Sequence, residues 1–247
     1  MTVFIYGIHP VLEALQKRPQ AFQRILLAKQ NLVGPLKQIA SLAKRAGIRT
    51  SYEIPKNIFR LTRSEHHQGV AAEVEPFPLM DFETLISTYK NRAEKAFFVV
   101  LDSIQDPHNF GSLLRSAACS KVQAVIFPKD RSVRLTGSVA KASAGAIEHL
   151  PLCRVVNIAA TLARLKQEGI WIVGTLPNCE KNIYEFDFDL DLALVIGSEE
   201  KGIRPLVQIK CDFLVSIPMQ GTLDSLNASV AGAVVLFEAL RQRQKIG

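Results

Sequence analysis

The chain has 247 residues, 48% of them hydrophobic, with a net charge of +7 and an isoelectric point of about 9.3. This length suits one large domain or two small ones. No apolar run approaches the roughly 20 residues of a membrane helix, and the opening MTVFIYGIHP lacks the features of a signal peptide. The four cysteines and five histidines have no metal-ligand spacing, which predicts free thiols in a reducing cytoplasm and no metal site.

Residues 1–75 are predicted to form a small α/β module. Apolar spacing and β-branched runs indicate, in chain order, helix 9–17, strand 23–29, helix 31–47 ended by Gly47, strand 48–54, helix 54–62 and strand 69–75. This module carries 11 Lys or Arg against 5 Asp or Glu, a net charge of +6, whereas residues 96–247 carry 16 against 15. The asymmetry favours a module that faces a polyanion over a solvated basic surface.

Residues 76–95 contain two prolines near their start and are predicted to be a linker. The sequence leaves open whether this linker contains a helix. From Phe97 onward strands and helices alternate, which predicts an α/β fold with a parallel sheet covered by helices on both faces. The predicted strands are 97–104, 123–128, 150–156, 170–176, 192–198 and 213–218. The helices between and after them are one that begins at Asn109, then 137–145, 157–169, 203–210 and about 225–243. Ligands of such sheets bind at the carboxyl ends of the strands.

Four of these strand ends are rich in polar residues and glycine. In QDPHNFGSLLRSAACS (105–120), Asp106-Pro107 ends the strand, Asn109 is the expected N-cap, and Arg115 lies off the apolar face of the helix. The others are IVGTLPN (172–178), LALVIGSEEKGIRP (192–205) and the segment that begins at 214. One such end would be an ordinary cap or turn, but four on one sheet favour a ligand crevice. No GxGxxG or GxxxxGK[ST] motif follows a strand, which disfavours a nicotinamide dehydrogenase or a P-loop enzyme.

Three motifs in order resemble those of the SpoU-type RNA 2′-O-ribose methyltransferases of the SPOUT superfamily. They are NFGSLLR (109–115), VIGSEEKG (195–202), and SIPM (216–219) followed by SLNAS (225–229). YGIHPVLEAL (6–15) looks like the start of that family's RNA-binding domain, which is similar to a ribosomal-protein fold. The resemblance covers essentially the whole chain. It implies an RNA-binding domain at 1–75, a linker at 76–95, a catalytic domain at 96–247 with a trefoil knot, and an obligate homodimer.

The resemblance also implies that S-adenosyl-L-methionine is the cofactor. The positions that match the family's cofactor loops are Thr175, Leu176, Pro177, Asn178, Gly197, Ser198, Glu199, Gly202, Ile217, Pro218, Met219, Ser225, Leu226 and Ser229. Backbone groups would read the edge of the adenine, and Leu176, Ile217 and Leu226 would sandwich the ring. The chain departs from the family at Glu200, where a Gly is usual. A positive φ or a close approach of the ligand would require that Gly.

Arg115, Asn109, Glu199 and Asn227 are the catalytic residues that the resemblance implies. Arg115 would clamp a phosphate bidentately and stabilise charge on the 2′-oxygen, since an arginine is a poor base. Asn109 would orient the ribose or Arg115, and Glu199 would hold Arg115 or Asn227. In this hypothesis the phosphate assists deprotonation of the hydroxyl, and Ser225 completes the polar wall.

The family type that the chain most resembles methylates a guanosine ribose in large-subunit (23S) ribosomal RNA in the cytoplasm. A guanosine of the tRNA D-loop is an alternative substrate. Two further alternatives on the same scaffold are an antibiotic-resistance enzyme that methylates adenosine and a non-catalytic RNA-binding protein, which would need a broken cofactor crevice. RNA binding through the basic module would be sensitive to salt and guided by RNA shape.

Overall fold

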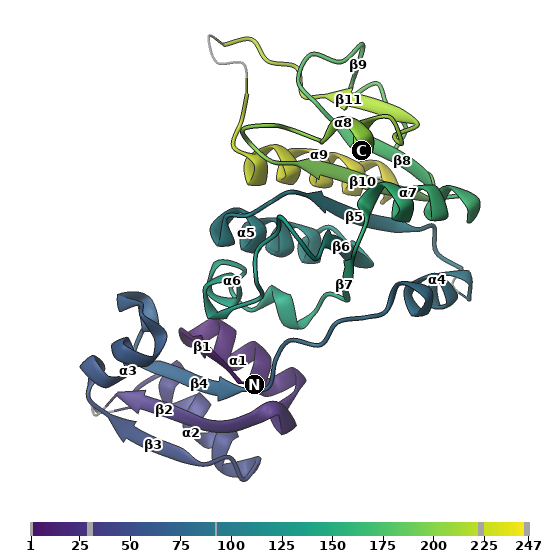
Figure 1. The fold of residues 1–247 in the computed structure, drawn as a ribbon. Helices are drawn as coiled ribbons and strands as arrows, with labels where there is room; N and C mark the ends of the chain where they lie inside the picture. The colour runs from purple at the N-terminus through teal and green to yellow at the C-terminus, as the bar shows by residue number, and fades with distance from the viewer. Residues whose placement is uncertain (1, 29–31, 92, 222–224, 245–247) are drawn as a thin grey trace. The chain divides into compact units, whose positions relative to one another are not determined.

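The computed structural model describes residues 2–28, 32–91, 93–221 and 225–244, which group into two compact units (Figure 1). The first unit extends to Phe77 and also includes Arg134–His149, and the second holds Pro78–Val133 and the residues from Leu150 onward. The four cysteines are free, as predicted. Within the described ranges, no helix is long and apolar enough to cross a membrane.

The first unit is built on a four-stranded sheet in the order β1-β4-β2-β3. Its elements are β1 (Val3–Tyr6), α1 (Ile8–Lys17), β2 (Phe22–Ala28), α2 (Pro35–Arg45), β3 (Thr50–Glu53), α3 (Pro55–Thr62) and β4 (Val70–Val74). Strands β2 and β3 are parallel and the other pairs are antiparallel. The predicted elements are confirmed except that β1, only four residues long, was missed. The predicted ends at Lys29 and Asn31 lie outside the described residues.

A segment from later in the chain packs with the first unit. This segment, Arg134–His149, carries α6 (Gly137–Ala142) and a short 3-10 turn. Arg18 forms a bidentate ion pair with Glu148: Nε donates a hydrogen bond to Oε2 at 2.5 Å, and Nη2 donates one to Oε1 at 3.0 Å. Both side chains are almost fully buried. Gly137 lies so close to the carbonyl of Phe4 that a Cβ there would collide with it. The pattern of the sequence predicts this helix but not the unit that it joins.

The second unit is a seven-stranded sheet in the order β7-β6-β5-β10-β8-β11-β9, in which every neighbouring pair is parallel. Its strands are β5 (Phe97–Asp102), β6 (Ala124–Pro128), β7 (Leu152–Val155), β8 (Trp171–Thr175), β9 (Lys181–Asn182), β10 (Leu192–Gly197) and β11 (Phe213–Ser216). Its helices are α4 (Phe82–Lys90), α5 (Pro107–Cys119), α7 (Ile158–Gln167), α8 (Pro205–Gln208) and α9 (Ala228–Arg243). The predicted α/β fold is confirmed, whereas the trefoil knot stays a prediction.

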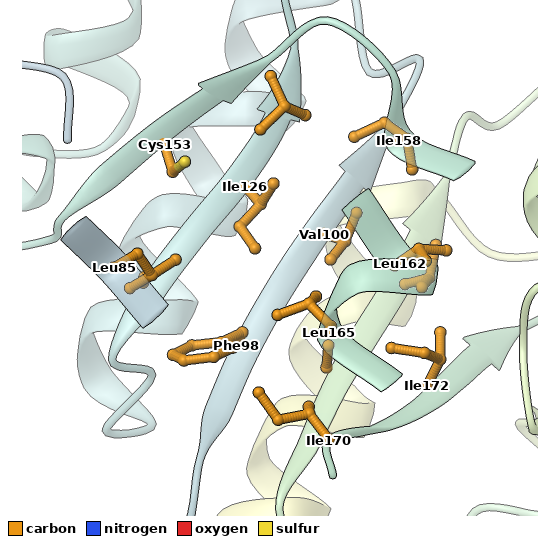
Figure 2. Packing of buried hydrophobic residues seen from close by; sticks show 14 of the residues in the cluster. Leu85, Phe98, Val100, Ile126, Cys153, Ile158, Leu162, Leu165, Ile170 and Ile172 are labelled. Atoms are coloured by element: carbon orange, nitrogen blue, oxygen red, sulfur yellow. The ribbon is translucent and has the colours of Figure 1, made fainter. Parts of the chain in front are cut away.

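Helices cover both faces of this sheet, because its central strands are apolar on both sides. On one face, side chains of α4 and α7 pack on alternate strand residues, and Figure 2 shows Leu85, Leu162 and Leu165 in the same cluster as Phe98 and Val100. On the other face α5 packs against α9, where a Cβ at Gly232 would collide with Leu113. Buried apolar area of this kind is the main source of stability.

One local prediction is wrong. Asp106, and not Asn109, caps α5, because its carboxylate accepts the backbone N–H of Asn109 at 2.9 Å. Pro107 follows as the first helical residue, a position where its missing N–H costs nothing. Asn109 therefore lies inside the first turn of the helix, and its side chain is free for another contact.

We predict that Glu148→Gln lowers the free energy of unfolding by about 3 kcal/mol, since it leaves a buried guanidinium without its carboxylate. Urea unfolding measures this loss, and Glu65→Gln, at an exposed position of the same unit, should change stability by less than about 0.5 kcal/mol. A loss for Glu148→Gln as small as that of the control would contradict the importance of the pair.

Candidate functional site

The four polar strand ends lie side by side. Strands β5, β10, β8 and β11 are consecutive neighbours in the sheet and all run in the same direction. Their carboxyl ends therefore meet at one edge, which is where parallel sheets bind ligands. The loops after these strands carry the residues that the motifs single out.

A carboxylate joins three of the predicted catalytic residues. Glu199 Oε1 accepts a hydrogen bond from Asn109 Nδ2 at 3.0 Å, another from Asn227 Nδ2, and a third from the backbone N–H of Ala228 at 3.1 Å. Asn227 Nδ2 also donates to Asn109 Oδ1 at 3.0 Å. Hydrogen bonds to an ionised carboxylate are the stronger kind, so this cluster fixes both amide side chains.

Asn227 has two functions in this arrangement. Its side-chain oxygen caps α9, accepting the backbone N–H groups of Ser229 at 3.0 Å and Val230 at 3.3 Å. Its side-chain NH₂ group then points to Glu199 and Asn109. A single residue thus begins the helix and also orients the cluster.

A largely apolar cavity of about 370 Å³ opens beside the cluster. Most of the predicted cofactor residues line it: Thr175, Leu176, Pro177, Gly197, Ser198, Glu199, Gly202, Ile217, Met219, Ser225 and Leu226. Ile196, Val215, Ala228, Ala231 and Val235 line it as well and were not predicted, because strand and helix interiors carry no motif. Asn178, Pro218 and Ser229 do not line it. Asn178 makes the turn after β8 with φ 55°, and the Ser229 hydroxyl donates to Asn227 Oδ1 at 2.6 Å.

The loop between β10 and α8 closes on itself at the mouth of this cavity. Ser198 and Gly202 exchange two backbone hydrogen bonds, of 3.1 and 2.8 Å. A Cβ at Gly197 would collide with the backbone of Gly202, and Gly202 has φ 60°, so both positions favour glycine. Glu200 does not adopt a positive φ, so the backbone conformation does not call for a Gly there.

A second, polar cavity of about 720 Å³ adjoins the first. Both are lined by Ser198–Gly202 and Ala228, so the loop that carries Glu199 and the first residue of α9 form their common wall. The remaining lining residues are Ser103, Ile104, Gln105, Asp106, Asn109, Arg131 and Arg204. Arg131 is exposed and brings a positive charge to this cavity.

A buried ion pair that the sequence analysis missed holds the loop in place. Asp102 is the fully buried last residue of β5. Its carboxylate accepts hydrogen bonds from the backbone N–H of Arg204 at 2.9 Å and from Arg204 Nε at 2.7 Å. Arg204 Nη2 lies 2.6 Å from Asp102 Oδ1. Arg204 follows the loop directly and precedes α8. A carboxylate that ends the otherwise apolar strand FFVVLD is a signal that could have identified this pair.

Arg115 stands apart from the cluster. Its side chain is exposed and lines neither cavity. Within the described parts of the chain it makes no ion pair, and the contact with Glu199 or Asn109 that the hypothesis contained is not formed. Among those residues there is also no group of His, Cys, Asp or Glu that could hold a metal ion.

Two family descriptions match the chain. Residues 96–237 match the SpoU rRNA Methylase family, and residues 4–80 match the RNA 2'-O ribose methyltransferase substrate binding family. The chain is 40% identical over 244 residues to YacO of Bacillus subtilis, provisionally named a TrmH family tRNA/rRNA methyltransferase; the match covers 99% of this chain and 97% of the relative. It is 40% identical over 240 residues to the 23S rRNA (guanosine-2'-O-)-methyltransferase RlmB of Coxiella burnetii, covering 97% and 96%.

Solved structures agree with these relatives. The SpoU methyltransferase AviRb of Streptomyces viridochromogenes superposes with a TM-score of 0.81 at 25% identity, over 99% of this chain and 90% of that chain. The complex of AviRb with AdoMet superposes with a TM-score of 0.79 at 22% identity, over 99% and 91%. The chain therefore belongs to the SpoU rRNA methylase family of RNA 2′-O-ribose methyltransferases, as its three ordered motifs indicated.

Proposed function

We propose that the chain transfers a methyl group from S-adenosylmethionine to the ribose 2′-oxygen of a guanosine in large-subunit ribosomal RNA. The observation that carries this proposal is the Asn109–Glu199–Asn227 cluster, whose central residue Glu199 lines both the apolar and the polar cavity. The guanosine and the 23S RNA are supported by the 40% identity to a relative named for that reaction.

The apolar cavity suits S-adenosylmethionine. Its volume of about 370 Å³ falls in the range of small-molecule sites. Leu176, Ile217 and Leu226 line it and would cover the two faces of the adenine, while the loop from Gly197 to Gly202 would offer backbone groups to its polar edges. AviRb, which shares the fold, was crystallised with this cofactor.

The polar cavity would hold the target nucleotide. Arg131 and Lys201 line it and would attract the phosphates, and Asn109 faces both this cavity and Glu199. A ribose placed there would lie next to the wall that separates it from the cofactor. Holding two reactants in line in this way can remove about 7–11 kcal/mol of a reaction barrier.

In the reaction, the bound cofactor supplies a methyl group on a positively charged sulfur. The ribose 2′-oxygen forms a bond to the methyl carbon as the carbon–sulfur bond breaks, and the hydroxyl proton leaves to an oxygen of the neighbouring phosphate. Asn109 and Asn227, fixed by Glu199, orient the ribose. Arg115 clamps the phosphate and stabilises negative charge on the 2′-oxygen, because a guanidinium stays protonated and binds phosphate bidentately.

In a homodimer, Arg115 of one copy would reach the methyl-transfer site of the other copy. Arg115 follows Asn109 by six residues, which places it about 120° around the helix, and it is exposed. Helix α9 is apolar on nearly all sides, yet Val230 and Phe237 are each 49% exposed. A helix of that kind is normally covered. We therefore propose that the chain dimerises through α9 and that Arg115 acts in the site of the second copy.

Residues 1–75 are proposed as the RNA-binding domain, residues 76–95 as the connection, and residues 96–247 as the catalytic domain. The match of residues 4–80 to a substrate-binding family and the net charge of +6 in residues 1–75 support the first assignment. We place the reaction in the cytoplasm, where free cysteines are the usual state.

We expect labelled S-adenosylmethionine to place 2′-O-methylguanosine in an unmodified large-subunit rRNA transcript. Arg115→Ala should lower kcat by roughly 100-fold or more, because it removes charge stabilisation from the transition state, and should change the cofactor Kd less than threefold. Lys121→Ala, on the turn after α5, is the matched control. If the label appeared in tRNA alone, tRNA would be the substrate in place of ribosomal RNA. If the protein bound RNA normally but did not bind the cofactor, the non-catalytic alternative would be favoured.

Gly197→Ala should weaken cofactor binding with the fold retained, since the added methyl group displaces the backbone of Gly202. Calorimetric titration with S-adenosylmethionine is expected to give a Kd about 100-fold weaker, which corresponds to about 2.7 kcal/mol. Ser87→Ala, at an exposed position of α4 that lines neither cavity, is the control and should bind the cofactor as the wild type does. Wild-type affinity in Gly197→Ala would place the cofactor elsewhere.

Phe237→Lys should convert the protein to monomers, because a charge on a covered apolar face is costly. Light scattering after size exclusion measures the mass, and methyl transfer should fall with it. Ile209→Lys, at an apolar residue that is 75% exposed on the turn after α8, should leave the mass unchanged. A monomeric wild type, or a dimeric Phe237→Lys variant, would contradict the proposed interface.

A further inference from the structure

A groove in the first unit, between α2 and β3, is not part of the site described above. The cavity has a volume of about 510 Å³ and is lined by Lys37, Ala40, Ser41, Lys44, Ile48, Thr50 and Tyr52. The lining residues of α2 recur every three or four positions, so they lie on one face of the helix. The opposite wall is β3, which is at the edge of its sheet and, among the described strands, pairs with β2 alone.

The end of α2 builds this groove. Gly47 adopts φ 68°, and the backbone N–H of Ile48 donates to the carbonyl of Ala43 at 2.9 Å. This pair of features is the glycine-dependent helix ending that turns the chain back on itself. The strand that follows therefore runs beside the helix, and Tyr52 faces the same hollow as Lys44.

The segment that forms the groove is basic and contains no acidic residue. Residues 32–52 contain four basic residues and neither Asp nor Glu. The four, Lys37, Lys44, Arg45 and Arg49, are all exposed. The ion pairs of the first unit that the described residues form involve other cations, namely Arg18, Arg24 and His149.

The groove is lined by no carboxylate, and three carboxylates of the first unit have partners of their own. Glu73 pairs with Arg24 at 2.7 Å, and Glu13 lies 2.6 Å from His149. Glu53, the residue at the end of β3, accepts from Asn57 Nδ2 at 2.9 Å. Lys37 and Lys44, the two cations that line the groove, form no ion pair among the described residues, so their charge is available for an external anion.

An aromatic side chain lies among these cations. Tyr52 is 51% exposed, which leaves a face of its ring open to the groove. Proteins bind single-stranded RNA by combining a basic groove along the backbone with aromatic rings on which bases stack. Lys37 and Lys44 are seven residues apart, about 10 Å along the helix, so they would contact different phosphates of one strand.

We infer that the α2–β3 groove binds a single-stranded segment of the substrate RNA, with phosphates on Lys37 and Lys44 and a base stacked on Tyr52. The inference rests on the proposed function for its choice of RNA, and it adds a contact site outside the methyl-transfer site. An exposed aromatic ring that lines the groove together with two lysines favours RNA over an acidic protein, which needs charge but no stacking platform.

The test measures binding of the full-length protein to an unmodified large-subunit rRNA transcript by filter binding between 50 and 200 mM salt. The variants are Lys37→Gln/Lys44→Gln, Tyr52→Leu and Tyr52→Phe. The matched control is Lys56→Gln/Arg60→Gln, which removes two exposed charges from α3 of the same unit. Thermal melts and the cofactor Kd verify that each variant is folded.

We expect Lys37→Gln/Lys44→Gln to weaken binding about tenfold or more at low salt and to lower the slope of log Kd against log salt by about 1.4, the value for two phosphate contacts on a single strand. Tyr52→Leu should weaken binding about 5- to 150-fold with an unchanged slope, and Tyr52→Phe should bind as the wild type does. At saturating RNA, kcat should be unchanged in all of them.

Groove variants that bind RNA within threefold of the wild type would overturn the inference and leave another macromolecule as the partner. An equal loss in the control pair would also overturn it, because the effect would then be general charge. Failure of the proposed function is distinguishable: the wild type would transfer no methyl group to any RNA, while the groove variants would still lose RNA affinity.

Discussion

The site depends on one carboxylate oxygen that receives three hydrogen bonds. Glu199 Oε1 binds the amide of Asn109 from α5, the amide of Asn227, and the first backbone N–H of α9. These donors come from segments about 90 and 30 residues away in the chain, so the carboxylate joins all three motifs. Without it, two amides and a helix end would each lose a partner at the wall between the cavities. Gly197 and Gly202 place Glu199 there by letting the loop close.

Most of the secondary structure and the position of the site loops could be predicted from the sequence, because both follow from local sequence patterns. The apolar strand FFVVLD, the Gly47 helix ending and the alternation after Phe97 each reflect a short-range rule, and the observed elements follow them. The motifs located the loops at the sheet edge correctly for the same reason: the carboxyl ends of parallel strands meet wherever the strands are neighbours. What the motifs could not supply was the pairing between loops, since the sequence does not say which amide meets which carboxylate.

The features that the sequence did not predict depend on tertiary contacts between distant segments of the chain. Arg18 and Glu148 are 130 residues apart, and neither stands in a motif, so their buried pair and the packing of Arg134–His149 with the first unit were invisible in the sequence. The Asn109 error has a different origin. Asn and Asp are about equally good caps, and Pro107 decides between Asp106 and Asn109 because it must occupy the first turn. Asn109 is thereby released from capping, and the released side chain is the one that reaches Glu199.

The two surfaces proposed for ligands differ in the source of their binding affinity and therefore in how that affinity depends on salt. The cofactor cavity is mostly apolar, so its affinity derives from buried area and from a few fixed hydrogen bonds, neither of which salt weakens much. The groove between α2 and β3 is basic and open, so its affinity derives largely from released counterions and falls steeply with salt. Raising the salt concentration should therefore raise the KM for RNA while leaving the cofactor Kd almost constant. This separation follows from where the charges lie, because the basic excess of the chain is concentrated in residues 1–75 while residues 96–247 are nearly neutral.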